Sequence, residues 1–249
     1  MDAAFYDIVR REGLTGKAEQ WGSLVTCSQY RLAYQKTTHY IQDDFLCLDW
    51  GCGNGHFSFY LVRRGLDVHG FSFEKIPEFL AASKRFHYRA GEQAEPVALP
   101  YASGQFDAVF SMGVLEHVHD FGGDQSRSVR EIERALKPGG LFLIFHLPNQ
   151  YSWIEFLVRV LNRWRKTKKH EHTKLFTERD VRELLQGTSF RILESGRYNF
   201  IPRNSFNRLP KALADQPWFC RLADAGDNLL ARLLPGLCQN WYFILQKGS

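Results

Sequence analysis

The chain has 249 residues, of which 44% are hydrophobic and 24% are charged, and its formal net charge at pH 7 is +5. This length suits one α/β domain with a full core, and the charge is too small to indicate nucleic acid as a partner. The five cysteines form no CxxC pair, which favours reduced thiols in a cytoplasmic protein over a disulfide frame.

Residues 1–20 carry charges throughout and so lack the apolar segment of a signal peptide. No stretch reaches the roughly 20 apolar residues that would cross a bilayer. We therefore expect a cytoplasmic protein, or one that lies on a membrane surface. Further along, residues 28–41 are predicted to form a helix.

Short apolar runs alternate with amphipathic segments from residue 45 onward. The apolar runs predict strands at 45–50, 66–73, 86–91, 106–112 and 141–147. Helices are predicted between them at 56–65, 75–86 and 126–140. Such alternation predicts a parallel sheet with helices on both faces and ligands at the carboxyl ends of the strands.

The first predicted strand ends in an acid that three glycines follow: Asp49, then Gly51, Gly53 and Gly55. Glycine permits positive φ and lets a ligand approach the backbone closely. A dinucleotide fingerprint, G-x-G-x-x-G, would need its third glycine where His56 stands. There is no G-K-[ST] either, which excludes a phosphate-binding P-loop.

The stretch LDWGCGNG resembles the first motif of the class I S-adenosylmethionine-dependent methyltransferases. Two later stretches, LPYASGQFDAVFSMGVLEHVHD and REIERALKPGGLFLIFHLPN, are similar to later motifs of that family. The resemblance covers residues 28–200, and among the branches the chain most resembles the quinone-biosynthesis O-methyltransferases and related small-molecule and saccharide methyltransferases. It implies an α/β fold with a Rossmann-like, seven-stranded mixed sheet, a lid insertion after strand five and a C-terminal helical insertion.

We accordingly expect a single methyltransferase domain over residues 1–249. Its expected parts are an N-terminal helical cap (1–44), a cofactor-binding core (45–148), an amphipathic lid (149–176) and a C-terminal part that closes the sheet (177–249). In the last part, 189–199 and 240–247 look like the antiparallel strand pair of the family. The leucines of a predicted helix at 218–236 would serve the core or cover the acceptor.

The resemblance also implies S-adenosylmethionine as the cofactor. The glycine turn, with Cys52 and Asn54 between its glycines, would hold the methionine part against backbone, and Asp49 would receive the ammonium group. Arg31 would pair with the carboxylate, a task that suits bidentate guanidinium geometry; otherwise it is a solvated helix arginine.

The contacts implied for the nucleoside lie at the next strand ends. Glu92 would accept from the adenine amino group, or be an ordinary surface glutamate, and the backbone of Gln93 would contact the ring. Phe71 or Phe73 would flank the adenine or belong to the core, and Met112 would pack beside the adenine or the sulfonium.

Ser72 departs from the family pattern. The family usually has an acid there that binds both ribose hydroxyls, whereas a serine makes one weaker hydrogen bond. Glu74 would be a substitute from two residues further along the strand, about 6–7 Å away.

Methyl transfer is an in-line displacement in which orientation supplies most of the rate, although an oxygen nucleophile benefits from a base or a metal. The candidate catalytic residues are His117, His146 and His172. Quinone-type relatives carry a metal-binding E-x-x-E-H here, but Gly113 replaces the first glutamate. Only Glu116 and His117 remain as ligands, so no metal is expected; alternatively, these two residues mainly shape the turn.

The lid begins with an S-x-x-E capping box, Ser152 to Glu155. Its apolar residues fall on one helical stripe and arginines and lysines fill the remainder: the stripe is Trp153, Phe156, Leu157, Val160, Leu161 and Trp164. Two interpretations stay open. Residues 152–169 either contact an anionic membrane surface or form a lid packed on the domain itself.

The sequence therefore predicts an enzyme that O-methylates a small hydroxylated acceptor, lipid-like or sugar-bearing. One alternative is a methyltransferase of glycan or natural-product intermediates without membrane contact. Another is a non-catalytic cofactor-binding regulator, which Ser72 favours. No nucleic acid is expected as partner, since strand four lacks a following N/D-P-P-Y/F motif.

Overall fold

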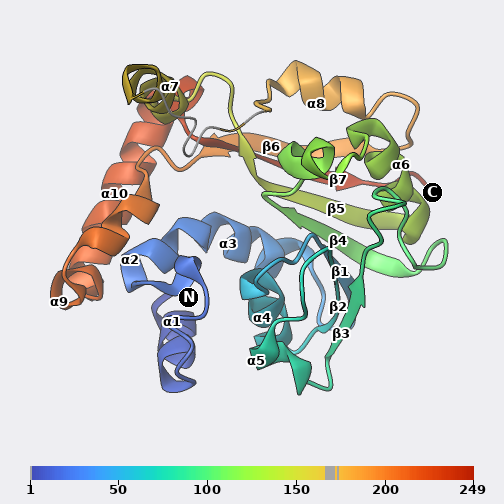
Figure 1. Cartoon of the computed structure of the whole chain (residues 1–249), viewed down its shortest axis with the longest axis horizontal. Helices are drawn as coiled ribbons and strands as arrows, with labels where there is room; N and C mark the ends of the chain where they lie inside the picture. Colours follow the sequence, from blue (N-terminus) through green and yellow to red (C-terminus); the bar gives the residue numbers. More distant parts are fainter. Residues whose placement is uncertain (1, 166–171, 173) are drawn as a thin grey trace.

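The computed structural model describes residues 2–165, 172 and 174–249, and these residues build a seven-stranded sheet (Figure 1). The strand order is β3-β2-β1-β4-β5-β7-β6. The strands are β1 (Leu46–Trp50), β2 (Asp67–Ser72), β3 (Phe86–Ala90), β4 (Phe106–Met112), β5 (Leu136–Pro148), β6 (Arg191–Tyr198) and β7 (Asn240–Gln246). β7 runs antiparallel to both its neighbours and the other pairs are parallel, which confirms the predicted Rossmann-like mixed sheet.

Helices cover both faces of the sheet, as Figure 1 shows. One face carries α1 (Asp2–Arg11), α3 (Arg31–Tyr40), α4 (His56–Arg63) and α5 (Glu78–Ala81), and the other carries α6 (Gln125–Ala135) and α8 (Glu178–Leu184). The remaining helices are α2 (Leu24–Cys27), α7 (Trp153–Arg165), α9 (Lys211–Ala214) and α10 (Pro217–Leu233). Short 3-10 turns are η1 (Glu19–Trp21), η2 (Ser28–Tyr30), η3 (Leu115–Phe121), η4 (Arg203–Arg208) and η5 (Pro235–Leu237).

Two predicted helices are shorter than expected. α6 ends at Ala135 rather than at 140, because the backbone before Pro138 is already extended in β5. The helix predicted at 75–86 shrinks to the single turn of α5, which starts after Pro77. The division of the chain into cap, core, lid and closing part stays a prediction.

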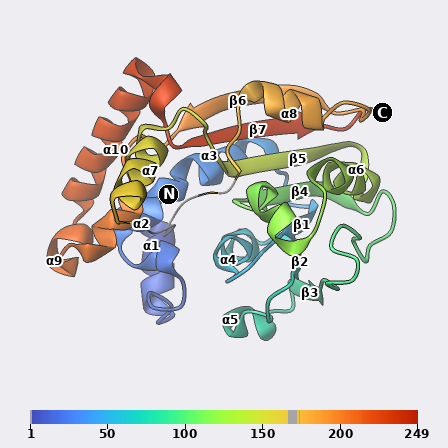
Figure 2. The same cartoon turned by 45° about the horizontal axis from the view of Figure 1, so that its top comes forward.

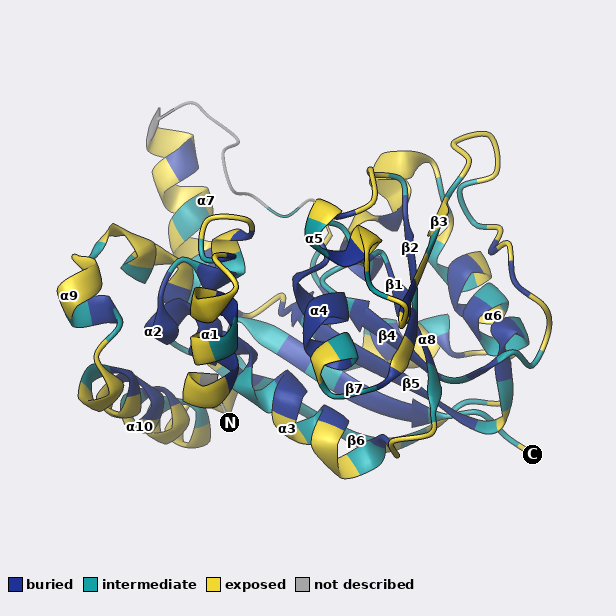
Figure 3. Ribbon diagram, turned by 90° about the horizontal axis from the view of Figure 1, so that it is seen from below, coloured by how far each residue is buried: buried dark blue, intermediate teal, exposed yellow. Residues whose placement is uncertain are grey.

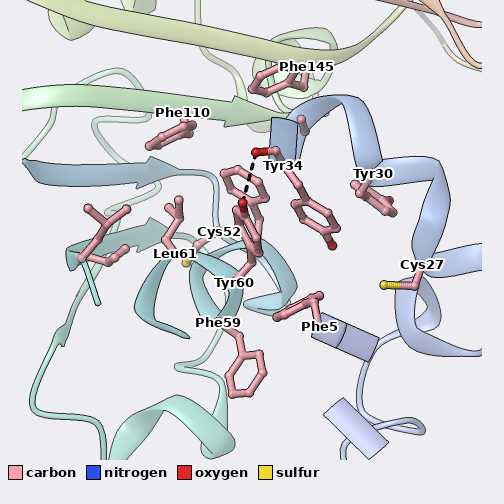
Figure 4. Close-up of a cluster of buried hydrophobic side chains, with 14 of the residues drawn as sticks. Phe5, Cys27, Tyr30, Tyr34, Cys52, Phe59, Tyr60, Leu61, Phe110 and Phe145 are labelled. Carbon is pink, nitrogen blue, oxygen red and sulfur yellow. Dashed lines mark hydrogen bonds between the residues drawn. The ribbon is translucent and has the colours of Figure 1, made fainter. Parts of the chain in front are cut away.

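Aromatic side chains fill the interface between the N-terminal helices and the sheet (Figure 4). Tyr34 of α3 stacks on Tyr60 of α4 with ring centroids 4.1 Å apart, and Phe5 of α1 meets both rings edge-on. The Tyr60 hydroxyl donates to the carbonyl of Tyr34 at 3.1 Å. The N-terminal helices are thereby fixed beside the carboxyl end of β1.

A buried ion cluster fixes α10 to the N-terminal region. Arg203 of η4 is 2% exposed, donates to Asp224 and to the hydroxyl of Ser28 (2.6 Å), and forms an ion pair with Asp227 (3.1 Å). Asp224 also accepts from Arg31 at 2.6 Å. Both carboxylates are therefore paired inside the protein, on the buried face of α10.

None of the helices among the described residues is long and apolar enough to pass through a bilayer.

We predict that Arg203→Ala lowers the free energy of unfolding by about 3–5 kcal/mol, because it leaves buried Asp227 without its cation and Asp224 with Arg31 alone. Arg182→Ala is the control, since Arg182 pairs with Glu178 on the exposed side of α8 and should contribute about 0.5 kcal/mol or less. Denaturant unfolding of both variants measures the difference. Equal losses would contradict the role given to the cluster.

Candidate active site

The turn after β1 has a shape that only glycine supports. Gly51, Gly53 and Gly55 have φ values of 75°, 47° and 77°. A Cβ on Gly51 would lie 2.5 Å from the side chain of Val114, and one on Gly55 would lie 2.6 Å from Pro77. A Cβ on Gly53 would approach nothing closer than 3.9 Å. Two of the glycines thus allow close packing, and Gly53 faces open space.

A cavity of about 440 Å³ lies at the carboxyl ends of β1, β2 and β4. Eight residues predicted to contact the cofactor line it: Gly51, Cys52, Gly53, Asn54, Phe71, Ser72, Phe73 and Met112. The remaining lining residues include Gln20, Glu74, Val114, His117, Asp120 and Phe121. The carboxyl ends of the strands meet here because β1 pairs in register with both β2 and β4.

Five predicted cofactor contacts fall outside this lining. Gly55 starts α4 beneath the turn, and Asp49 is buried behind it. Arg31 is ion-paired with Asp224, and Glu92 and Gln93 are exposed on the loop after β3. The assignments of Arg31, Glu92 and Gln93 to the cofactor remain predictions.

Asp49 is 1% exposed, and its Oδ2 accepts from the Ser58 hydroxyl at 2.6 Å. Its Oδ1 has no hydrogen-bond partner among the described residues. Burial raises the pKa of Asp49 to about 6, and the hydrogen bonds from Ser58 oppose the rise. An ammonium group held against the glycine turn would satisfy this carboxylate, so the site fits the amino-acid part of S-adenosylmethionine.

The β2 end supplies an aromatic wall and an acid. The Ser72 hydroxyl accepts from the Glu74 backbone at 3.1 Å, which folds Glu74 back so that it lines the cavity. Phe73 stacks on Phe121 of η3 with centroids 5.0 Å apart. Phe121 was not among the predicted site residues, because its contact with Phe73 joins segments almost 50 residues apart in the chain.

His146 sits at the end of β5 with a φ of 56°, a strained value for a residue with a side chain. Its backbone N–H donates to the Tyr198 hydroxyl at 2.8 Å, and its ring lies 4.4 Å from that of Tyr30. Tyr30 also contacts His56, at 4.8 Å. Burial lowers the pKa of both histidines to about 3, so both are neutral at pH 7.

Glu116 and His146 flank Gly113 at the edge of the cavity, since a Cβ on Gly113 would lie 3.5 Å from Glu116 Oε1 and 3.8 Å from His146 Cβ. Glu116 is 3% exposed, and its Oε2 has no partner among the described residues. Burial raises the pKa of Glu116 to about 7. From the sequence, Glu116 was a weak candidate for a metal ligand or a residue that shapes the turn, and the structure adds that it is a buried acid.

The other two candidate histidines lie together. His117 lines the cavity and bonds Asp120 through Nδ1 at 2.8 Å, and its ring is 6.3 Å from that of His172. His172 Nδ1 is 2.8 Å from Glu155 Oε1, and this hydrogen bond raises the pKa of His172. The predicted capping box is therefore half formed: Ser152 accepts from the Glu155 backbone at 3.4 Å, while the Glu155 carboxylate binds His172.

Metal ligands are not grouped in the part of the chain that the structure describes: no three His, Cys, Asp or Glu residues there are arranged to hold an ion. Glu116 is buried, and His117 is bonded to Asp120.

Known proteins resemble this chain in the same region. A family profile described as a methyltransferase domain matches residues 48–144. The chain is 25% identical over 203 residues to a protein of Mycolicibacterium smegmatis described as a probable S-adenosylmethionine-dependent methyltransferase, covering 76% of this chain and 73% of that protein. It is 28% identical over 163 residues to the ubiquinone biosynthesis O-methyltransferase of Ruegeria pomeroyi, covering 62% of this chain and 63% of that one.

Among solved structures, the chain is similar to a Burkholderia thailandensis 1,6-didemethyltoxoflavin-N1-methyltransferase with bound S-adenosylhomocysteine. The TM-score is 0.56 at 17% identity, covering 99% of this chain and 87% of that one. This structural likeness supports the fold alone. The matched sequences, together with the glycine turn and the buried Asp49, support S-adenosylmethionine as the cofactor. The chain belongs to the class I S-adenosylmethionine-dependent methyltransferases.

Proposed function

We propose that the chain methylates a hydroxyl oxygen of a small acceptor that is lipid-like or sugar-bearing. The observation that carries the proposal is Glu116, a buried carboxyl group beside the cavity whose Oε2 has no partner among the described residues. Hydroxyl acceptors need a group that takes their proton, and a base is most effective when its pKa is near the working pH. The likeness to a ubiquinone biosynthesis O-methyltransferase supports the same chemistry.

The cavity residues would hold the cofactor in one orientation. Asp49 would bind the ammonium group, Gly53 would let the amino-acid part lie on the backbone, and Glu74 would accept from the ribose in place of the acid that Ser72 replaces. Bound S-adenosylmethionine supplies an electrophilic methyl group on a sulfonium. The protein supplies alignment and an enclosed site, which accounts for most of the rate in such displacements.

We propose that Glu116, rather than His146, accepts the proton of the acceptor hydroxyl. A histidine whose pKa burial lowers to about 3 does not accept a proton at neutral pH, although its ring can still orient the acceptor. Glu116, with its pKa near 7, is deprotonated in a large fraction of molecules. His172, held by Glu155, is a second group near Glu116, and His117 lies at the cavity wall.

Helix α7 supports an acceptor with lipid character. Most of its apolar residues point outward: Phe156 is 71% and Trp164 86% exposed, whereas Trp153 packs on Phe200 and Glu155 is buried. This arrangement favours contact with a membrane over a lid packed on the domain. The exposed basic residues that the structure describes on α7 include Arg159 and Arg163, whereas positions 166–169 of the predicted segment lie outside the described residues.

The test is a screen for S-adenosylhomocysteine release with phenols, lipid-linked sugars and hydroxylated metabolites, each with and without anionic vesicles. We expect turnover with at least one hydroxylated acceptor. Glu116→Gln should lower kcat about 10²- to 10⁴-fold at unchanged cofactor affinity, and the exposed Glu178→Gln should not. Cofactor binding without turnover of any acceptor would instead indicate a regulator.

We predict that Gly53→Arg abolishes cofactor binding, because the added side chain would extend into the open space of the cavity. Gly104→Arg is the matched control: Gly104 has a φ of 66° with nothing near its Cβ, and it lies outside the cavity. Both substitutions carry a similar backbone cost of about 1–2 kcal/mol. Calorimetric titration of both variants distinguishes the two sites, and retained binding in Gly53→Arg would place the cofactor elsewhere.

We predict that cofactor affinity falls as the pH drops through about 6, the pKa to which burial raises Asp49. The carboxylate attracts the ammonium group above this pH and loses its charge below it. Between about pH 7 and about pH 5 the dissociation constant should rise about tenfold. Asp49→Asn should bind weakly at both pH values, and a wild-type affinity independent of pH would rule out the contact.

A further inference from the structure

The connection between β6 and β7 is far longer than the sheet requires. The two strands are antiparallel neighbours, and Tyr198 at the end of β6 pairs with Asn240 at the start of β7. Two such strands can be joined by a few residues. Here residues 199–239 intervene and form η4, α9, α10 and η5, which extend beyond the sheet at the end where the N-terminal helices lie (Figures 1 and 2).

Helix α10 turns its apolar side away from the protein. Trp218, Leu222, Leu229 and Leu233 are 53%, 63%, 58% and 67% exposed and share one stripe of the helix. The side that faces the protein carries Cys220, Ala223, Asp224 and Asp227. The prediction that the leucines of this helix serve the core is wrong, because Leu222, Leu229 and Leu233 are exposed. The exposed side of α10 faces away from the protein (Figure 3), and cover of the acceptor by these leucines stays a prediction.

Buried charges hold this orientation. Asp224 and Asp227 bind Arg203, so rotation of α10 that buried its leucines would take both carboxylates away from their cation. The third acid of the insertion, Asp215, accepts from the Tyr6 hydroxyl at 2.9 Å and from the Leu24 backbone at 3.0 Å. All three acids of residues 199–239 are thus engaged within the protein.

The exposed charges of the same insertion are all positive. They are Arg208, Lys211, Arg221 and Arg232. Arg221 and Arg232 lie on α10 along one border of the apolar stripe, because 11 residues are about three helical turns. A stripe of tryptophan and leucines with cations along one border is complementary to a bilayer with anionic headgroups, where the apolar side enters the interface and each cation gains electrostatic attraction.

We infer that α10 is a membrane-contact surface that binds the face of an anionic bilayer. It is separate from the contact proposed for α7, although both helices contact the segment after β6: Trp153 Nε1 donates to the Phe200 carbonyl at 2.8 Å, and the Ile201 N–H donates to Asp227 at 2.7 Å. The inference does not depend on methyl transfer, so its test needs no acceptor.

The experiment is co-sedimentation of the full chain with vesicles of phosphatidylcholine, with and without phosphatidylglycerol. We expect binding to the anionic vesicles and much weaker binding to the neutral ones. Leu229→Glu/Leu233→Glu should reduce binding to the anionic vesicles about tenfold or more, since it places charges in the stripe. Leu193→Glu is the control, because Leu193 is an exposed leucine on β6.

A second pair of variants tests the charges. Arg221→Gln/Arg232→Gln should weaken binding about fivefold per arginine at low salt. Arg179→Gln/Arg182→Gln removes two exposed arginines from α8 and should leave binding unchanged. Circular dichroism and thermal unfolding check that all four variants fold.

Three results would overturn the inference. The first is a wild-type chain that binds neither vesicle. The second is full binding by Leu229→Glu/Leu233→Glu, which would assign the membrane contact to α7 alone. The third is a dimer in light scattering that the same substitutions dissociate, which would make a second copy the occupant of the stripe. Loss of methyl transfer alone has no bearing on any of them.

Discussion

The close packing around the glycine turn is the constraint on which the site depends. Val114, after β4, occupies the space where Gly51 would carry a side chain, and Pro77, after β2, does the same at Gly55. The loops that follow three neighbouring strands therefore meet within van der Waals distance of one backbone turn. Because the strands are in register, this contact fixes the cavity wall, and of the three glycines Gly53 is the one whose missing side chain leaves open space.

Four buried acids form two pairs that differ in whether their carboxylate oxygens are satisfied within the protein. Asp224 and Asp227 bind Arg203, so their charges are balanced by a cation within the protein. Asp49 and Glu116 are equally buried, but each has one oxygen without a partner among the described residues. A buried polar atom without a partner destabilises the folded state, so a bound ligand that supplies the partner recovers this free energy. Asp49 and Glu116 lie beside the cavity, as binding and proton transfer require.

Much of this architecture could be predicted from the sequence, because it is encoded locally. Apolar runs gave the strands, and the glycine spacing after Asp49 gave the turn. The orientation of α10 could not be predicted: helical periodicity separates Leu222 and Leu229 from Asp224 and Asp227 without saying which side faces inward. Arg203 decides that, and it lies about 20 residues away. The Tyr30 and Tyr198 contacts of His146 were missed for the same reason, since they join distant segments.

Helix α7 is oriented like α10: its acidic residue, Glu155, is buried, and most of its apolar residues are exposed. Its acid, Glu155, binds His172, whose ring lies 6.3 Å from that of His117 at the cavity wall. Helix α7 and the cavity wall are thus connected through His172, which is hydrogen-bonded to Glu155 and lies beside His117. A displacement of α7 at a surface would act directly on His172, whereas the ion cluster of Arg203 holds α10 without contact to the cavity. The two helices therefore have different physical relations to the site: α10 can only fix where the enzyme sits, and α7 can also change the position of a group near Glu116.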